Sequence, residues 1–271
     1  TLTNKESHTI FNNSTRITIV DTSAEKTGVV DNISHGRGAV YNNINAAITL
    51  QGGSYTRSQE ASTGSDASGS NSWYVLKNFG TMTIKDGVTV KFSDSNSGLY
   101  SSLIGNGWQN SSAAEAGSNG EPKPNAGGKQ AKLTINGGTF TGGQITVKND
   151  DYGELTITGG SYTVTAAGHG MAGKDSLAVA GGTFTITSGK DGLHAENADD
   201  SSLGFLYVAD GEFTIAAQGD AVSASGALQA DGGTFDLTTG EGSASVTMST
   251  GDSFGPGGMG EGPGGQNGAR P

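Results

Sequence analysis

Residues 189–197 read GKDGLHAEN and bring two acidic side chains, a histidine and an asparagine close together around two glycines. Carboxylates and amides are oxygen ligands for hard cations such as Ca²⁺, and histidine takes part in acid–base chemistry and in metal binding. The stretch is therefore a candidate metal loop or active site, with a plain turn as the alternative. Which of these holds depends on the residues that the fold places beside it.

A repeat in the sequence predicts the fold that positions this stretch. Weaker copies of the repeated unit begin at Met82, Ile48 and, more faintly, Ile17. The clear copies are LTINGGTF, LTITGGSY, LAVAGGTF, LYVADGEF and LQADGGTF, which begin at Leu133, Leu155, Leu177, Leu206 and Leu228. The steps between the clear copies are 22, 22, 29 and 22 residues.

The repeated unit has the chemistry of β-strands. Apolar residues alternate with Thr, which is typical of strands with one buried face, and the GG pairs favour a bend. About 22 residues suffice for one rung of three short strands and three turns. A leucine-rich repeat has a similar period but requires a different consensus and a ladder of Asn. The sequence therefore predicts an all-β, single-stranded, right-handed parallel β-helix, a solenoid of about 22 residues per rung.

Stacked rungs place equivalent residues in columns that run along the solenoid. The Leu residues that open the units are expected to form an aliphatic column in the core. The aromatic residues that follow the GG pairs are expected to form a second column, which is core packing rather than a platform for sugars: Phe140, Tyr162, Phe184, Phe213 and Phe235.

Departures from the repeat predict the domain organisation. The β-helix is expected to span residues 1–249, with polar loop insertions near 58–72 and 106–130. Residues 250–271 are rich in Gly and Pro and poor in apolar residues, so a disordered tail or linker is expected there. Since the chain begins with Thr rather than Met, we expect a mature or excised piece of a longer surface protein. We also expect this segment to be monomeric.

The composition excludes several classes of partner. The 271 residues include 15 Lys and Arg against 26 Asp and Glu, for a net charge of −11. This balance argues against nucleic acid and anionic membrane surfaces and leaves cations as partners. No apolar run approaches the roughly 18 residues that a membrane span requires. The chain has no Cys, which excludes disulfides and thiolate metal sites.

The repeat aligns residues of the opening stretch with residues of neighbouring rungs. Counting equal distances from the start of successive units places His169, Asp191 and Asp220 in one column, at the turn before the third strand. Carboxylates on adjacent rungs lie about 5 Å apart and repel each other, which a bound cation relieves. Stacked oxygen ligands suit Ca²⁺, whereas turn-favouring Asp and Asn in solvated loops are the alternative. The 29-residue step adds further candidate ligands: Glu196, Asn197, Asp199 and Asp200.

Four other residues are candidates for contact with a sugar. His169 would be a poor Ca²⁺ ligand and is expected to end the metal column. His194 is expected to point outward from its strand, with Lys190 close to the acidic column. Trp108, in the stretch GNGWQN, is a candidate to present its ring to a sugar. No residue is assigned a catalytic role.

The second half of the chain also carries a family resemblance. The stretches GELTITGGSYTV, GKDGLHAENADDSSLGFLYVADGEFTI and GDAVSASGALQADGGTF resemble clostridial carbohydrate-binding surface proteins with a pectate-lyase-like fold. The resemblance implies a right-handed parallel β-helix, bound Ca²⁺ and an acidic plant polysaccharide such as polygalacturonate. Of the family's repeated Asp-Gly-[Ile/Leu] turn, Asp191-Gly192-Leu193 is a match and Asp220-Ala221-Val222 keeps only the Asp. In the first half, VYNNINAAITLQGGSYTRS resembles adhesin-like β-helix repeats of gut Firmicutes.

These observations favour an extracellular carbohydrate-binding or adhesive module on a bacterial cell surface. Bound Ca²⁺ would bridge protein carboxylates to the uronates of an acidic polysaccharide. A structural stalk of a large surface adhesin is the first alternative. A Ca²⁺-dependent polysaccharide lyase is the less favoured one, because the base that such an enzyme needs is usually Arg or Lys. The only basic residues between 145 and 250 are Lys148, Lys174 and Lys190.

Overall fold

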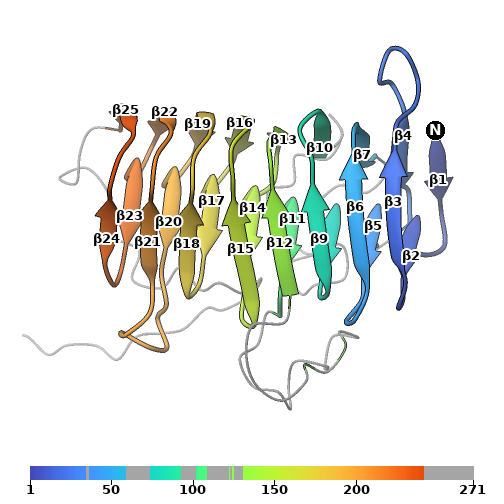
Figure 1. Ribbon diagram of the computed structural model, residues 1–271, viewed down its shortest axis with the longest axis horizontal. Helices are drawn as coiled ribbons and strands as arrows, with labels where there is room; N and C mark the ends of the chain where they lie inside the picture. Colours follow the sequence, from blue (N-terminus) through green and yellow to red (C-terminus); the bar gives the residue numbers. More distant parts are fainter. Residues whose placement is uncertain are drawn as a thin grey trace, which may run out of the picture.

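The computed structural model is a parallel β-helix, as the repeat predicts (Figure 1). It describes residues 1–34, 37–58, 74–92, 102–108, 122, 124 and 131–240. All strands in these ranges pair in parallel and stack along one axis, with the N-terminus at one end of the stack (Figure 1). Within the same ranges there is no helix long and apolar enough to cross a membrane.

Three sheets form the walls of the solenoid among the described residues, and each rung contributes one strand to each sheet. Sheet A consists of β1 (Leu2–Asn4), β4 (Val29–Asn32), β7 (Gly53–Arg57), β10 (Val88–Phe92), β13 (Gly138–Thr141), β16 (Ser161–Ala166), β19 (Thr183–Ser188), β22 (Glu212–Ala217) and β25 (Thr234–Thr239). Sheet B consists of β2 (Ile10–Asn12), β5 (Val40–Asn42), β8 (Leu76–Asn78), β11 (Ile104–Asn106), β14 (Val147–Asn149), β17 (Met171–Gly173), β20 (Leu193–Ala195) and β23 (Val222–Ala224). Sheet C consists of β3 (Arg16–Val20), β6 (Ala47–Gln51), β9 (Thr81–Ile84), β12 (Ala131–Ile135), β15 (Gly153–Ile157), β18 (Ser176–Val179), β21 (Phe205–Val208) and β24 (Leu228–Ala230).

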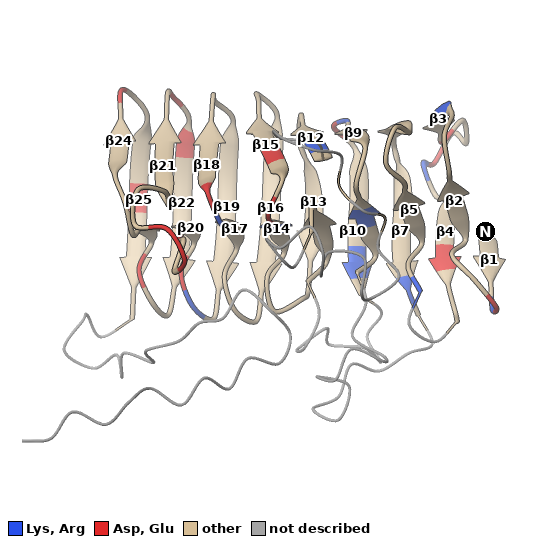
Figure 2. Cartoon of the chain, turned by 90° about the horizontal axis from the view of Figure 1, so that it is seen from below, with Lys and Arg blue, Asp and Glu red and all other residues tan. Residues whose placement is uncertain are grey.

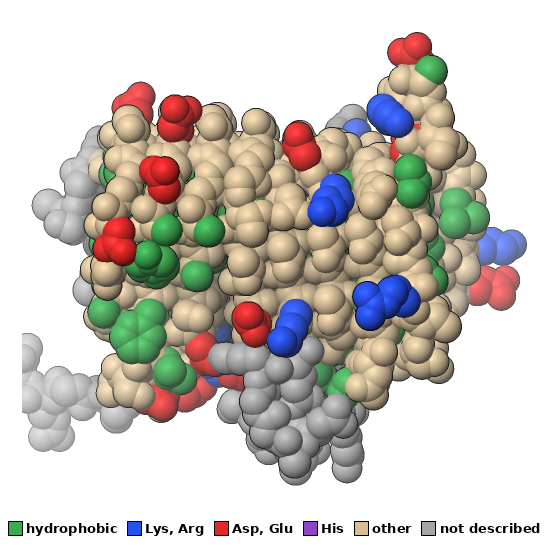
Figure 3. Space-filling view, viewed as in Figure 1, with side chains coloured by type: hydrophobic (Ala, Val, Ile, Leu, Met, Phe, Trp, Pro, Cys, Tyr) green, Lys and Arg blue, Asp and Glu red, His purple; other side chains and the backbone are tan. Residues whose placement is uncertain are grey.

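The alternation of Thr with apolar residues decides which side chains enter the core. In β16, β19 and β22 every second residue is buried and the residues between them are exposed. Leu133 pairs with Leu155, and Leu206 pairs with both Leu177 and Leu228, so the aliphatic column runs along sheet C. The outer face of sheet C is mostly uncharged, and its apolar side chains gather over β21 and β24 (Figure 3).

The aromatic column contains four of the five predicted rings. Tyr162, Phe184, Phe213 and Phe235 stack with ring centroids 4.4, 4.7 and 4.8 Å apart and planes within 6° of parallel. Phe140 is the exception, because the register pairs it with Val164 and pairs Gly138 with Tyr162. A Cβ at Gly138 would lie 2.8 Å from Cζ of Phe140, so the ring folds back over the glycine. The equal spacing of the repeats therefore predicted the wrong column for Phe140.

A ladder of buried Asn side chains closes the corner that follows sheet B. The side-chain amides of successive rungs donate to each other's oxygens at 2.6–2.9 Å, and they also donate to main-chain carbonyls of sheet C. The ladder runs through the first five rungs: Asn12, Asn42, Asn78, Asn106 and Asn149. Gly173, Ala195 and Ala224 take the same position in the later strands, so the ladder ends at β14.

The predicted insertions fall mostly outside the described residues. Of the loops near 58–72 and 106–130, the described part comprises residue 58, residues 106–108 and residues 122 and 124. The Gly/Pro-rich segment 250–271 lies wholly outside the described residues.

Candidate functional site at the turns before β17, β20 and β23

The turns that precede β17, β20 and β23 stack on one another. The amide of Gly170 donates to the carbonyl of Asp191, and the amide of Gly192 donates to the carbonyl of Asp220, each at 2.9 Å. A Cβ at Gly192 would lie 2.6 Å from the carbonyl oxygen of Ala221, so the close stacking of these turns requires glycine after Asp191. The backbone therefore brings the side chains of neighbouring turns into contact.

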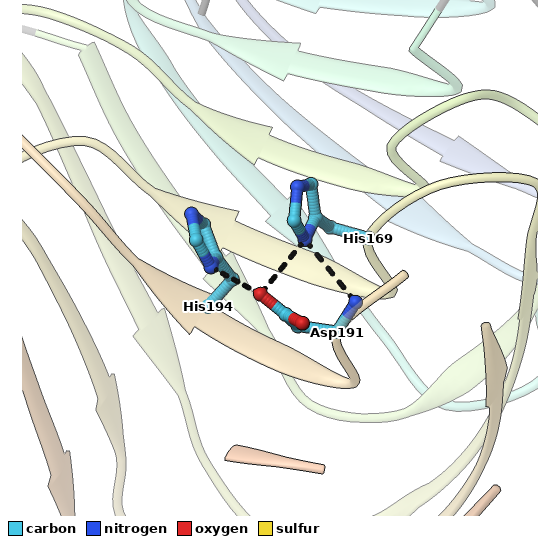
Figure 4. A group of neighbouring side chains, drawn as sticks. All are labelled: His169, Asp191 and His194. Carbon is cyan, nitrogen blue, oxygen red and sulfur yellow. Dashed lines mark hydrogen bonds and ion pairs between the residues drawn. The ribbon is translucent and has the colours of Figure 1, made fainter. Parts of the chain in front are cut away.

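The carboxylate of Asp191 is the centre of a cluster with His169 and His194 (Figure 4). Its Oδ2 lies 2.7 Å from Nδ1 of His194 and 3.4 Å from Nδ1 of His169. The two imidazole rings stack with centroids 4.1 Å apart and planes 23° from parallel. The other oxygen, Oδ1, accepts a hydrogen bond from the amide of Asp220 at 2.8 Å. We call these three residues the His–Asp–His cluster.

Burial and partners set the charge of the cluster. The side chains of His169, Asp191 and His194 are 8, 16 and 9 % exposed. Burial alone would raise the pKa of Asp191, but hydrogen bonds from His169, His194 and the Asp220 amide outweigh it and hold that pKa well below its usual range. The side chain of Asp191 therefore stays ionised at pH values at which an ordinary Asp is protonated.

The depressed pKa makes part of the stability depend on pH. A carboxyl with a native pKa below its unfolded value, about 3.9, stabilises the fold fully above that value. This stabilisation is lost as the pH falls through the native pKa. We expect the difference in unfolding free energy between the parent and Asp191→Asn to shrink between about pH 5 and about pH 2. Urea unfolding across this range measures it, and a difference that stays constant to the acid end would contradict the ionised state.

His194 occupies the outer side of β20 and is nevertheless buried. Its neighbours Leu193 and Ala195 belong to the core, so the ring projects to the opposite side of the strand, as the alternation predicts. There it stacks on His169, and its Nε2 lies 3.3 Å from Oε2 of Glu196. Both nitrogens of His194 thus face carboxylate oxygens.

Acidic residues, red in Figure 2, lie close together in the segment after β20. Hydrogen bonds within this segment mostly cap its own turns. Asn197 accepts hydrogen bonds from the amides of Asp199 and Asp200 and donates to the carboxylate of Asp175. Asp200 accepts from the amide and hydroxyl of Ser202. The carboxylate of Asp199 lies 2.7 Å from Nζ of Lys174. Among the described residues, the structure therefore brings Glu196 to the cluster and directs Asn197, Asp199 and Asp200 to other partners.

The cluster itself does not offer the oxygen-rich set that Ca²⁺ prefers, since two of its three donor groups are imidazoles. Asp220 differs from the members of the cluster because it is exposed. Its backbone amide donates a hydrogen bond to Asp191, which places the residue beside the cluster. Its carboxylate is an oxygen donor of the kind that Ca²⁺ takes. Lys190 precedes Asp191 and is half-buried.

Trp108 lies apart from the cluster and is fully buried. Its ring packs at 4.9 Å from Phe79 and edge-on at 5.8 Å from Tyr152, and its Nε1 donates to the carbonyl of Pro122 at 2.6 Å. The ring thus offers no open face to a sugar. The sequence suggested exposure because the residue flanks a polar insertion, but the aromatic residues of the neighbouring rungs enclose it.

Two lysines near the site are held by carboxylates. Lys148 pairs with Asp150 at 2.9 Å, and Lys174 lies 3.2 Å from Asp151 in addition to its contact with Asp199. Burial would lower the pKa of Lys174, but these two carboxylates outweigh it and raise that pKa. Lys174 therefore stays protonated, which does not suit a general base.

Comparison with known proteins finds a similarity in this half of the chain. Residues 129–262 match a family described as "Carbohydrate-binding domain-containing protein". This match supports a carbohydrate-binding role, and the description names binding rather than an enzymatic activity. The matched residues include every member of the His–Asp–His cluster.

One solved structure is also similar, a gadolinium derivative of the polysaccharide lyase-like protein from C. thermocellum. It is 18 % identical, covers 84 % of this chain and 88 % of its own, and has a TM-score of 0.32. At this identity and TM-score, the likeness says nothing about activity. None of the curated proteins matches the sequence.

Proposed function

We propose that this chain is a non-catalytic, extracellular carbohydrate-binding module that binds an acidic plant polysaccharide such as polygalacturonate at the bacterial cell surface. The match of residues 129–262 to a carbohydrate-binding family carries the proposal. The described part of that match, β12 to β25, contains the stacked turns with Asp191 and Asp220.

A cation is part of the proposal because the chain is acidic. With a net charge of −11, the protein repels a polymer of uronates unless counter-charge lies between them. Ca²⁺ supplies such charge and accepts carboxylate ligands from both partners. Asp220 is the residue that would hold the ion on the protein side, since it is exposed beside the stacked turns. Lys190, on the preceding rung, adds positive charge toward a uronate.

The state of two of the three lysines between residues 145 and 250 favours binding over lyase chemistry. A lyase requires a basic side chain that is free to take the C5 proton of a uronate. Lys148 and Lys174 are each engaged by buried carboxylates, and the pKa of Lys174 is raised rather than lowered. These lysines are therefore suited to neutralising the buried acids of the solenoid.

Binding to immobilised polygalacturonate, in excess Ca²⁺ or in chelator, tests the function. We expect retention in Ca²⁺ that is lost in chelator. Asp220→Asn should weaken binding in Ca²⁺ about tenfold, which corresponds to about 1.4 kcal/mol of binding free energy. The matched control is Asp236→Asn, an exposed acid in β25 of another sheet, which should bind as the parent does.

The outcomes separate the candidate functions. Equal binding in chelator would remove the cation from the proposal, and retention on neutral polysaccharide alone would remove the acidic ligand. Release of unsaturated uronate products would favour the lyase. Absence of binding to all the polymers would contradict the proposal and leave a structural stalk as the better interpretation.

A further inference from the structure

The His–Asp–His cluster has a feature that sugar binding does not explain. Nδ1 of His194 and Oδ2 of Asp191 are only 2.7 Å apart in a nearly buried environment. An unprotonated Nδ1 and a carboxylate oxygen both carry lone pairs, so a contact this short requires a positive centre between the two atoms. A proton on the imidazole is one such centre, and a metal ion that replaces the proton is the other.

We propose that His169, Asp191 and His194 form a binding site for a divalent transition-metal ion of the Zn²⁺ class. Nδ1 of each imidazole faces Oδ2 of Asp191 (Figure 4), and one donor atom of each residue lies within 4.8 Å of those of the other two. Three protein ligands from two adjacent rungs leave a fourth position for water or for an oxygen of a bound molecule.

The donor set selects the class of metal. Imidazole nitrogens with one carboxylate suit Zn²⁺, Ni²⁺, Cu²⁺ or Fe²⁺, whereas Ca²⁺ and Mg²⁺ prefer oxygen ligands throughout. The site is thus distinct from the proposed Ca²⁺ at Asp220, which is exposed and offers only oxygen. The inference does not depend on the proposed function.

The distances are close to those that a bound ion requires. Ligands about 2.0–2.2 Å from a tetrahedral ion lie about 3.3 Å from one another. The separation of 3.4 Å between Asp191 Oδ2 and His169 Nδ1 already fits, although this Nδ1 accepts a hydrogen bond from the Asp191 amide at 3.3 Å that the ion has to replace. The contact of 2.7 Å to His194 has to open by about 0.6 Å, and the stacked rings have to turn toward the ion.

The residues around the cluster match the outer shell of metal sites. A metal-bound imidazole usually donates its second N–H to a carboxylate, and a metal-bound carboxylate is usually hydrogen-bonded in turn. Glu196 lies 3.3 Å from Nε2 of His194, on the side of the ring away from Asp191. The amide of Asp220 donates to Oδ1 of Asp191 and leaves Oδ2 toward the imidazoles. Both outer contacts are therefore in place.

Titration of the full chain with Co²⁺, followed by visible absorption, tests the inference without any sugar. We expect one Co²⁺ per chain, with the ligand-field bands of nitrogen and oxygen coordination. Zn²⁺ should displace Co²⁺ and excess Ca²⁺ should not. Zn²⁺ should also raise the unfolding temperature, because it binds the folded state.

Variants test the assignment of ligands. Asp191→Asn and His194→Ala should abolish the bands, and Glu196→Gln should weaken binding about 10–100-fold without abolishing it. Glu154→Gln, an exposed acid in β15, is the matched control and should bind as the parent does. Circular dichroism establishes that each variant is folded, and His169→Gln is a milder change if His194→Ala does not fold.

The inference is overturned if the folded parent gives no Co²⁺ bands, which would leave a proton as the bridge between His194 and Asp191. It is also overturned if the bands persist in folded Asp191→Asn or His169→Gln. Either result leaves the polygalacturonate assay unaffected.

Discussion

Replacing Phe184 by Ala is expected to lower the free energy of unfolding by about 4 kcal/mol. The ring is 1 % exposed and lies between Tyr162 and Phe213, at centroid distances of 4.4 and 4.7 Å. The neighbouring rings are fixed one rung away by the strand pairing of β16, β19 and β22, so they cannot close the cavity. Urea unfolding followed by circular dichroism measures the loss.

The matched control is Thr185→Ala, the next residue of β19, which is exposed on the outer face. Its effect should stay within about 0.5 kcal/mol. Rungs of a solenoid contact only their neighbours, so a local cavity can divide the unfolding transition into parts. The dependence of the unfolding free energy on urea concentration should therefore be compared between variant and parent as well. An effect of Phe184→Ala no larger than that of the control would contradict the role of the stacked rings in the core.

The fold class was predictable because every copy of the repeat has the same strand-forming pattern. Each unit alternates Thr with apolar residues, and the structure pairs the unit starts Ile17, Ile48, Met82 and Leu133 in succession. The fainter copies at Ile17 and Ile48 thus belong to the same column as the clear ones. Strand pairing restores their register although the connections between them differ in length.

Phe140 shows the limit of arguing from spacing. The string GGTF occurs in several units, but the glycines of this unit adopt φ values of +131° and +138°, and the register places Gly138 opposite Tyr162. How a pair of glycines bends depends on the backbone of the adjacent rung. The string itself does not specify this.

The candidate site was predictable in its column and not in its chemistry. Equal spacing placed His169 and Asp191 on adjacent turns. The contact of both with His194 depends on the pairing of β17 with β20 and on a ring that projects from the outer side of its strand. Asn197, Asp199 and Asp200 were predicted as metal ligands because oxygen-bearing side chains are dense there. In the structure one oxygen each of Asn197 and Asp200 caps a local turn, and one of Asp199 contacts Lys174.

The Asn ladder was missed for a different reason. Its members are separated by unequal lengths of chain, so no period marks them in the sequence. The signal that could have found them is an Asn at the end of a short apolar strand, as in LKN, IGN and VKN. At that position the side chain can satisfy main-chain carbonyls exposed by the corner between sheets B and C.

Asn106→Ala should reveal how much this ladder contributes, with an expected loss of about 3 kcal/mol in unfolding free energy. Asn106 is fully buried and donates to the carbonyls of Ala131 and Glu154 at 3.1 Å and to Oδ1 of Asn149 at 2.6 Å. It also accepts from Asn78 at 2.6 Å. Removing the amide leaves these buried groups without their partner, in a corner that joins β11 to β12 and β15.

Two further variants make the test specific. Asn106→Asp keeps the shape but turns the donor into an acceptor that faces buried oxygens, so it should destabilise the protein at least as much at neutral pH. Asn43→Ala removes a half-buried amide whose partner, Asn13, lies at the surface, and it should cost less than about 1 kcal/mol. If Asn106→Ala were as mild as Asn43→Ala, the main-chain pairing of sheets B and C would hold the corner without the ladder. If Asn106→Asp were milder than Asn106→Ala, the side chain would fill space there rather than donate hydrogen bonds.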